Sequence, residues 1–286
     1  MNYQTRFHQL LDYIDFHLDE ELTVDKLSGI ACLSKYHFHR QFSSLFGLSA
    51  FSYIRLARMK RASYQLVFKK EMRIVDIAVA NGYESSEAFS RAFSQSIGQN
   101  PSQFRDQPQW TLWHEKYHQF KNLRIQRASS VSHHVDVVNF SEIKVAALAH
   151  LGALESLGNT INLFINWRIN NNLSPKISRT FNIVYDDPAV TEADKYRCDI
   201  CASIKSDVIK NDDGIFTKII PAGRCALIRH IGSDDTISET ITYLYSDWLV
   251  QSEEELRDYP IFFERINFFP DVPETEIITD IYLPLK

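Results

Sequence analysis

Two stretches of the chain, residues 24–47 and 75–98, carry the same order of apolar and polar positions at an offset of 51 residues. Each copy predicts a short apolar helix, a tight turn, a serine N-cap and a second helix with two phenylalanines one turn apart. The repeat therefore predicts two helix-turn-helix units in tandem. Seven positions are identical between the copies: Val24/Val75, Asp25/Asp76, Ser34/Ser85, Phe38/Phe89, Arg40/Arg91, Phe42/Phe93 and Gly47/Gly98.

The first copy has clear predicted helix ends. Thr23 can cap the first helix and Ser34 the second, and Gly47 stands where a left-handed C-cap is expected, so the second helix should run for about 12 residues. Helical spacing predicts one apolar stripe, made of Phe38, Phe42 and Leu45. The other side is predicted to present polar side chains to base edges or phosphates: Ser34, Lys35, Tyr36, His39, Arg40 and Ser43.

The second copy repeats this geometry with a less basic outer face. Phe89, Phe93 and Ile97 form the predicted apolar stripe, and the outer face holds Ser85, Ser86, Glu87, Ser90, Arg91 and Ser94. A single unit of this kind could equally be an amphipathic helix pair with a solvated outer face. Two units at a fixed spacing, joined by a predicted helix over residues 49–68, favour binding to double-stranded DNA.

Charge is divided unevenly along the chain. The net charge is −5, but residues 1–127 carry 17 Lys and Arg against 12 Asp and Glu, whereas the remainder carries 14 against 24. A basic N-terminal half fits a DNA-binding role. Seven basic side chains between the two units are expected to contact phosphates, a solvated helix face being the alternative: Arg55, Arg58, Lys60, Arg61, Lys69, Lys70 and Arg73.

A second repeat, at an offset of about 80 residues, occupies the C-terminal half. Residues 144–152 align with 224–232, and Thr160-Ile161 with Thr240-Ile241. Each half predicts a strand ending in His-x-Gly, an amphipathic helix and two further strands, so the expected fold is a duplicated β-α-β-β unit with a cleft between halves. His150 and His230 are interpreted as marking strand ends rather than binding metal.

These patterns predict an all-α domain over residues 1–110, a linker over 111–132 and an α+β domain over 133–286. Met1 leads directly into an amphipathic helix, and no apolar run approaches a membrane span, so a soluble, cytoplasmic protein without a membrane partner is expected. The four cysteines fit a reducing compartment. Cys198 and Cys201 lack a second such pair, so neither a metal site nor a cofactor is expected.

The N-terminal half resembles the AraC/XylS family of DNA-binding domains. The resemblance rests on LTVDKLSGIACLSKYHFHRQFSSLFGLSAFSYIRLARMKRASYQLV and on IVDIAVANGYESSEAFSRAFSQSIGQNPSQFR. It implies that Tyr36, His39 and Arg40 touch bases in one major groove, and that the second unit does so one helical turn away. The family commonly has amides where this chain has Ser86 and Glu87. Glu87 could accept a hydrogen bond from cytosine or could repel phosphate.

The C-terminal half resembles GyrI-like effector-binding domains through PAGRCALIRHIG, YDDP, FFER and TDIYLPL. This resemblance implies a buried carboxylate, Glu264, that faces aromatic residues and engages a lipophilic organic cation. The expected ligand-binding residues are Glu264, Tyr243, Trp248 and Phe262. Desolvation would make an unpaired Glu264 costly to ionise, and a bound cation would relieve that cost. The alternative is that Glu264 pairs with a Lys or Arg of the chain.

Together the two resemblances imply a transcription regulator, expected to be an activator that works with RNA polymerase and responds to a small-molecule effector. One chain should cover an asymmetric site of about 20 base pairs. Two alternatives concern the C-terminal half: a protein-interaction module, or a small-molecule hydrolase built on Glu264, Trp248 and Tyr243. Because the sequence offers no nucleophile–base pair, no catalytic residue and no enzyme activity are expected.

Overall fold

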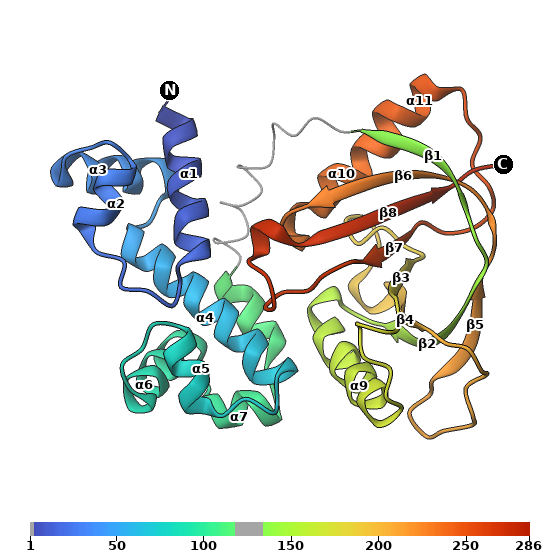
Figure 1. The fold of residues 1–286 in the computed structure, drawn as a ribbon, viewed down its shortest axis with the longest axis horizontal. Helices are drawn as coiled ribbons and strands as arrows, with labels where there is room; N and C mark the ends of the chain where they lie inside the picture. Colours follow the sequence, from blue (N-terminus) through green and yellow to red (C-terminus); the bar gives the residue numbers. More distant parts are fainter. Residues whose placement is uncertain (1–2, 118–133) are drawn as a thin grey trace. The chain divides into compact units, whose positions relative to one another are not determined.

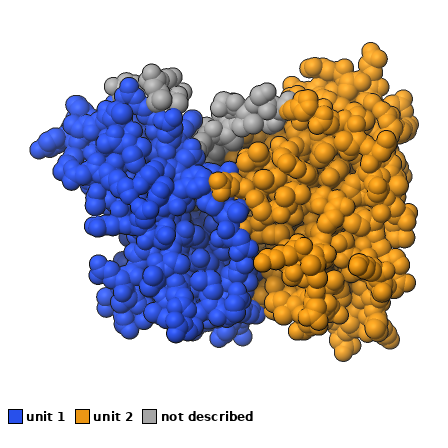
Figure 2. Space-filling view, in the orientation of Figure 1, with its two compact units in different colours: residues 1–130, 269–275 blue, residues 131–268, 276–286 orange. Residues whose placement is uncertain are grey.

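A computed structural model describes residues 3–117 and 134–286 (Figure 1). The chain divides into two compact units (Figure 2). The first is helical and comprises residues 1–130 and 269–275, and the second contains the sheet and comprises residues 131–268 and 276–286. Among the described helices, none combines the length and apolarity needed to cross a bilayer. The same residues contain no cluster of His, Cys, Asp and Glu suited to a metal ion.

The helical unit contains the two predicted helix-turn-helix motifs. Figure 1 shows the long helix α4 between the first set of helices and the second. Residues 110–117 are also helical. The elements are α1 (Tyr3–Phe16), α2 (Val24–Ile30), α3 (Lys35–Phe46), α4 (Ala50–Phe68), α5 (Ile74–Ala80), α6 (Ser86–Ile97) and α7 (Pro101–Asp106).

Buried phenylalanines hold α3 and α6 in place. Phe38, Phe42, Phe89 and Phe93 are all fully buried in one apolar core, and Phe38–Phe42 and Phe89–Phe93 are ring contacts at 5.9 and 5.5 Å between centroids. The prediction that Leu45 extends the stripe is wrong, because it is 47% exposed. Leu45 lies in the last turn of α3, where the helix has rotated its side chain past the edge of the core.

The predicted caps set the helix ends. Thr23, Ser34 and Ser85 accept hydrogen bonds from the backbone N–H groups of Lys26, His37 and Ala88. The second helix of each motif, α3 or α6 (called the recognition helices below), ends at a glycine in the left-handed region, with φ of 68° at Gly47 and 91° at Gly98. This conformation costs glycine little because it has no Cβ, and it stops each helix one turn beyond its last buried phenylalanine.

The sheet unit is one curled antiparallel sheet of eight strands, in the order β1-β6-β8-β7-β3-β4-β2-β5 (Figure 1). Its strands are β1 (Val135–Phe140), β2 (Ile143–Leu151), β3 (Thr180–Val184), β4 (Arg197–Ser203), β5 (Phe216–Ile220), β6 (Gly223–Ile231), β7 (Phe262–Arg265) and β8 (Ile278–Pro284).

The predicted duplication is present, but each half has one strand more than expected. The halves are β-β-α-β-β, and their first strands are exchanged: β1 pairs with β6 of the other half, and β5 pairs with β2. The two halves are joined by hydrogen-bonded strands at their junction. β3 pairs directly with β7, with Phe181 opposite Glu264, so the sheet continues across the junction.

The two faces of the sheet differ in what covers them. The helices α9 (Leu157–Asn170) and α10 (Ile237–Tyr243) pack on one face, where α10 continues through a π-helical segment (Leu244–Trp248) into α11 (Leu249–Ser252). The opposite face, called the inner face below, carries alternate strand residues and an aromatic cluster. The cluster comprises Phe140, Phe181, Phe262 and Tyr282, of which Phe262 and Tyr282 stack at 5.0 Å.

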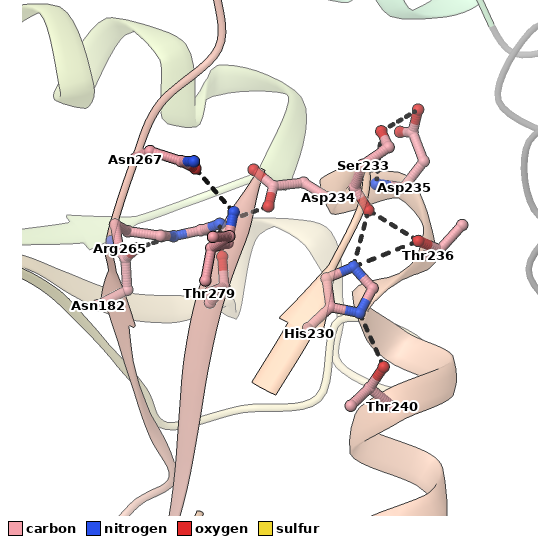
Figure 3. Close-up of polar contacts among 11 residues, drawn as sticks. Asn182, His230, Ser233, Asp234, Asp235, Thr236, Thr240, Arg265, Asn267 and Thr279 are labelled. Carbon is pink, nitrogen blue, oxygen red and sulfur yellow. Dashed lines mark hydrogen bonds and ion pairs between the residues drawn. The ribbon is translucent and has the colours of Figure 1, made fainter. Parts of the chain in front are cut away.

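The paired histidines join strand ends to helices. His230 Nδ1 lies 2.8 Å from Thr240 Oγ1 on α10, and its Nε2 lies 3.2 Å from the Ser233 carbonyl oxygen (Figure 3). His150 makes the equivalent contact with Thr160 on α9, also at 2.8 Å. Because both ring nitrogens already contact protein groups, this geometry supports the structural interpretation of the two histidines.

Candidate DNA interface and ligand site

The outer face of α3 is built as predicted from residues that point away from the phenylalanine core. Tyr36 is 89% exposed, and Ser34, His39, Arg40 and Ser43 are also exposed. Lys35, in the first turn, forms an ion pair with Asp25 of α2. This face offers hydroxyl, imidazole and guanidinium donors on a rigid helix, which is the chemistry that reads base edges in a major groove.

The outer face of α6 is mixed in charge. Arg91 and Glu87 are exposed, and Ser85, Ser86 and Ser90 are half-buried. A hydrogen bond from its own backbone N–H and the hydroxyls of Ser85 and Ser86 hold the pKa of Glu87 below its ordinary value. The carboxylate therefore stays ionised at the N-terminus of α6, where the helix dipole favours it.

Part of the basic stretch between the two units is used inside the helical unit. Arg58 donates to the backbone carbonyls of Leu18 and Glu20 at 2.8 and 2.6 Å. Arg61 donates to the Asn81 side-chain carbonyl at 3.0 Å and also to the Ala80 carbonyl. These guanidiniums join α4 to the neighbouring turns, so several of their donors are already used within the helical unit.

Three further members of the stretch pair with carboxylates. Lys60 Nζ lies 2.6 Å from Glu274 Oε1, with both side chains 8% exposed, and Lys69 Nζ lies 2.6 Å from Asp271 Oδ1. Arg73 makes a two-bond contact with Asp76 on the surface. The buried Lys60 is excluded as a phosphate contact. The exposed Arg55 and Lys70 keep that expected role.

Glu264 lies on the inner face of the sheet with a partner from the chain itself. Its two carboxylate oxygens accept from Arg179 Nε and Nη2 at 2.6 and 2.7 Å, and the Tyr282 hydroxyl lies 3.4 Å from Oε2. The expected unpaired carboxylate is therefore wrong, and the alternative, pairing with an arginine, is observed. Burial and the nearby Glu264 raise the pKa of Tyr282 to about 12.

The four residues expected to share a ligand site are not brought together. Phe262 and Glu264 are two residues apart on β7, so both point to the inner face, where Phe262 is fully buried. Tyr243 and Trp248 pack instead on the helix-covered face, beside Phe263. The sheet separates the two pairs, because the alternation of β7 decides which side chains reach each face. The arrangement proposed for a hydrolase, Glu264 with Trp248 and Tyr243, is not present.

A second carboxylate cluster lies on the inner face. Asp199 Oδ2 accepts from Lys218 Nζ at 2.7 Å and from the Tyr185 hydroxyl at 2.6 Å, and Lys218 also contacts that hydroxyl. Nearby, Cys198 and Cys201 point to opposite faces of β4 and are both buried. Burial raises the pKa of the Cys198 thiol to about 11. Both cysteines are therefore structural thiols, as the strand-like surroundings predicted.

Residues that sequence reasoning missed are the cations and carboxylates around Glu264. Arg179 comes immediately before β3, and Asp280 lies directly opposite Glu264 on β8. Asp280 is 5% exposed and accepts two hydrogen bonds from Arg229, at 2.7 and 2.8 Å. The only sequence signal is the TFNIV strand pattern after Arg179. Pairing it with Glu264 also requires the register of β3 with β7.

Comparison with known proteins gives separate matches for the two halves of the chain. Residues 133–286 match the GyrI-like small molecule binding domain, and residues 27–107 match a helix-turn-helix domain. The chain is 38% identical over 152 residues to the probable transcriptional regulator YgiV of Escherichia coli (strain K12), which covers 53% of this chain and 95% of that protein.

Two other relatives match the DNA-binding half. The uncharacterized HTH-type transcriptional regulator YbfP of Bacillus subtilis (strain 168) is 35% identical over 105 residues, covering 37% of this chain and 35% of that protein. The right origin-binding protein of Escherichia coli (strain K12) is 32% identical over 104 residues, covering 36% of each chain.

The fold, the two capped recognition helices and these matches define a DNA-binding transcription regulator of the AraC type with a small-molecule binding domain. The chain belongs to the GyrI-like family.

Proposed function

We propose that one chain binds an asymmetric duplex site of about 20 base pairs, with α3 and α6 in consecutive major grooves. The observation that carries this proposal is the repeated geometry of the two helices. Each begins at a serine cap, ends at a left-handed glycine, buries two phenylalanines and turns its arginine, Arg40 or Arg91, to solvent. Two reading elements in one chain remove the need for a dimer.

Arg40→Ala tests direct base reading. The substitution removes a bidentate donor from the exposed face of α3, so it should cost about 1 to 3 kcal/mol on the preferred site and relax specificity at one base position. Affinities of the full chain for the preferred site and for its single-base variants, measured at one salt concentration, give both values.

Lys70→Ala is the matched control. Lys70 is exposed and basic but lies outside both recognition helices, so its loss should weaken binding on all sequences by a similar factor and reduce the salt dependence. If Arg40→Ala behaves like Lys70→Ala, Arg40 is a phosphate contact and direct reading by α3 is disproved.

We further propose that the sheet unit senses a cationic small molecule at Glu264 and that the protein activates transcription together with RNA polymerase. The support for a cation is that Glu264 is buried, lies opposite Phe181 in the sheet with the Tyr282 hydroxyl 3.4 Å away, and is already paired with a positive group. Transcription from a selected site, reconstituted with RNA polymerase, should rise when the protein is added; a fall would indicate repression.

A further inference from the structure

Three of the ion pairs on the inner face of the sheet share an asymmetry. In each pair the carboxylate is almost completely buried and the cation is partly exposed. The side-chain exposures are 11% for Glu264 against 47% for Arg179, 7% for Asp280 against 55% for Arg229, and 5% for Asp199 against 30% for Lys218. The carboxylates are therefore fixed in the fold, whereas each cation lies between its carboxylate and solvent.

Two of these carboxylates are direct neighbours. Glu264 and Asp280 occupy opposite positions in the antiparallel register of β7 and β8, and alternation places both on the inner face. Like charges directly opposite each other destabilise a sheet, and burial strengthens the repulsion. Each carboxylate consequently needs a counter-ion in place, which Arg179 and Arg229 supply.

The Arg179 pair combines a planar, two-donor cation with aromatic rings. Its guanidinium carbon lies 5.0 Å from the ring centroid of Phe181 and 5.9 Å from that of Phe140, while both Nε and Nη2 donate to Glu264. In the Asp199 pair a ring is also near, with Lys218 Nζ 5.0 Å from the Tyr185 ring centroid, but the cation there is a compact ammonium. Among the described residues, Arg229 has no such ring contact. A planar cation with two parallel N–H donors fits this place by hydrogen bonding and by attraction to the rings.

The Arg179 side chain can leave this place without unfolding the strand. Its backbone N–H is held separately, by Ser203 Oγ at 2.9 Å, and nearly half of its side-chain surface already faces solvent. A departing guanidinium would regain water, and its positive charge must then be replaced at Glu264.

We propose that Arg179 is a resident counter-ion that competes with the effector, and that the effector is a planar amidinium or guanidinium attached to an apolar ring. This inference rests on the proposed sensing role of Glu264. Because the effector can bind only when the Arg179 side chain has moved away from Glu264, the need to displace Arg179 lowers the apparent affinity of the intact protein for the effector. A quaternary ammonium, which has no N–H donors, binds less well than an amidinium of similar size.

The test uses the full chain and three probes that share a benzene ring. Benzamidine is planar and charged, benzamide is its neutral counterpart, and benzyltrimethylammonium is charged but has no N–H. Arg179→Ala should bind benzamidine about tenfold more tightly than the parent, because the competitor is gone. Calorimetric titration and the rise in Tm should both show the order benzamidine, then benzyltrimethylammonium, then benzamide.

Two variants make the result specific. Arg179→Ala/Glu264→Gln should lose the tighter binding of benzamidine, and the matched arginine variant Arg229→Ala should not gain it. If Arg179→Ala does not fold, Arg179→Gln keeps a neutral donor toward Glu264 and should show the same order of probes. The proposal is overturned if the parent and both Arg179 variants bind benzamidine with equal affinity. It is also overturned if Arg179→Ala binds benzamide as tightly as benzamidine.

Operator affinity of the parent, measured without any probe, separates this inference from the proposed function. If the parent shows no sequence-specific DNA binding, the regulator proposal is contradicted, while the benzamidine result can still be interpreted. Tight binding of benzyltrimethylammonium that Arg179→Ala leaves unchanged would support a cation sensor but overturn the role of Arg179.

Discussion

A single buried thiol should make the free energy of unfolding fall at alkaline pH. Burial raises the pKa of Cys198 from 9.0 to about 11, so the folded state holds this proton more tightly than the unfolded state. The resulting stability is complete below pH 9 and is lost as the pH rises toward 11, when the unfolded chain gains by ionising first. By pH 11 the loss from this thiol should be about 2 kcal/mol.

Chemical denaturation at several pH values between 8 and 11 measures this loss. Cys198→Ala removes the thiol and should flatten the decline by the stated amount relative to the parent, while Cys32→Ala, which changes an exposed cysteine, should leave it unchanged. Equal declines in the parent and Cys198→Ala would contradict the linkage.

The exposure of side chains on a single helix could be predicted from the sequence. The pairing of side chains on different strands of the sheet could not. The exposed positions of Tyr36, His39 and Arg40 follow from helical spacing and the buried phenylalanines alone. The partner of Glu264 lies 85 residues away in sequence, and its identity depends on how β3 pairs with β7. The sequence therefore left pairing with a Lys or Arg as an open alternative.

At the scale of elements, α7 begins with a reciprocal cap that can be tested alone. Asn100 Oδ1 accepts from the Gln103 N–H at 2.9 Å, and Gln103 Oε1 accepts from the Asn100 N–H at 3.2 Å. Asn100→Ala removes one of these bonds and leaves a donor without its cap, so unfolding of the helical unit should become easier by about 1 kcal/mol.

Denaturant titration of the full chain, followed by helical circular dichroism, measures that change. Ser102→Ala, an exposed position in the same first turn, serves as the control and should lie within about 0.5 kcal/mol of the parent. A cost in Ser102→Ala equal to that in Asn100→Ala would show that the cap has no separate effect.

Most helices were predictable as elements, whereas the first strand of each half of the sheet was not. Helices such as α3 and α6 have strong spacing and explicit caps at both ends. β1 and β5 are the two edge strands, and their mixed burial leaves little alternation of apolar and polar residues to read. Their exchange between halves arises only when the whole sheet forms.

For the whole molecule, the uneven distribution of charge along the chain follows the two kinds of candidate site. The basic N-terminal half contains the two recognition helices, and the acidic C-terminal half contains the buried carboxylates of the inner face. The overall charge of −5 conceals both features. Many of the basic side chains between α3 and α6 make contacts within the helical unit, so our proposal assigns the reading of DNA sequence to α3 and α6.

Selection of bound sequences from a random DNA pool tests that claim most directly, when it is run with the parent, Arg40→Ala and Arg91→Ala. The parent should select one asymmetric site, and each variant should lose preference at a different position, the two lying about 10 base pairs apart. Loss at the same position in both variants, or a uniform loss at every position, would contradict reading by two helices of one chain.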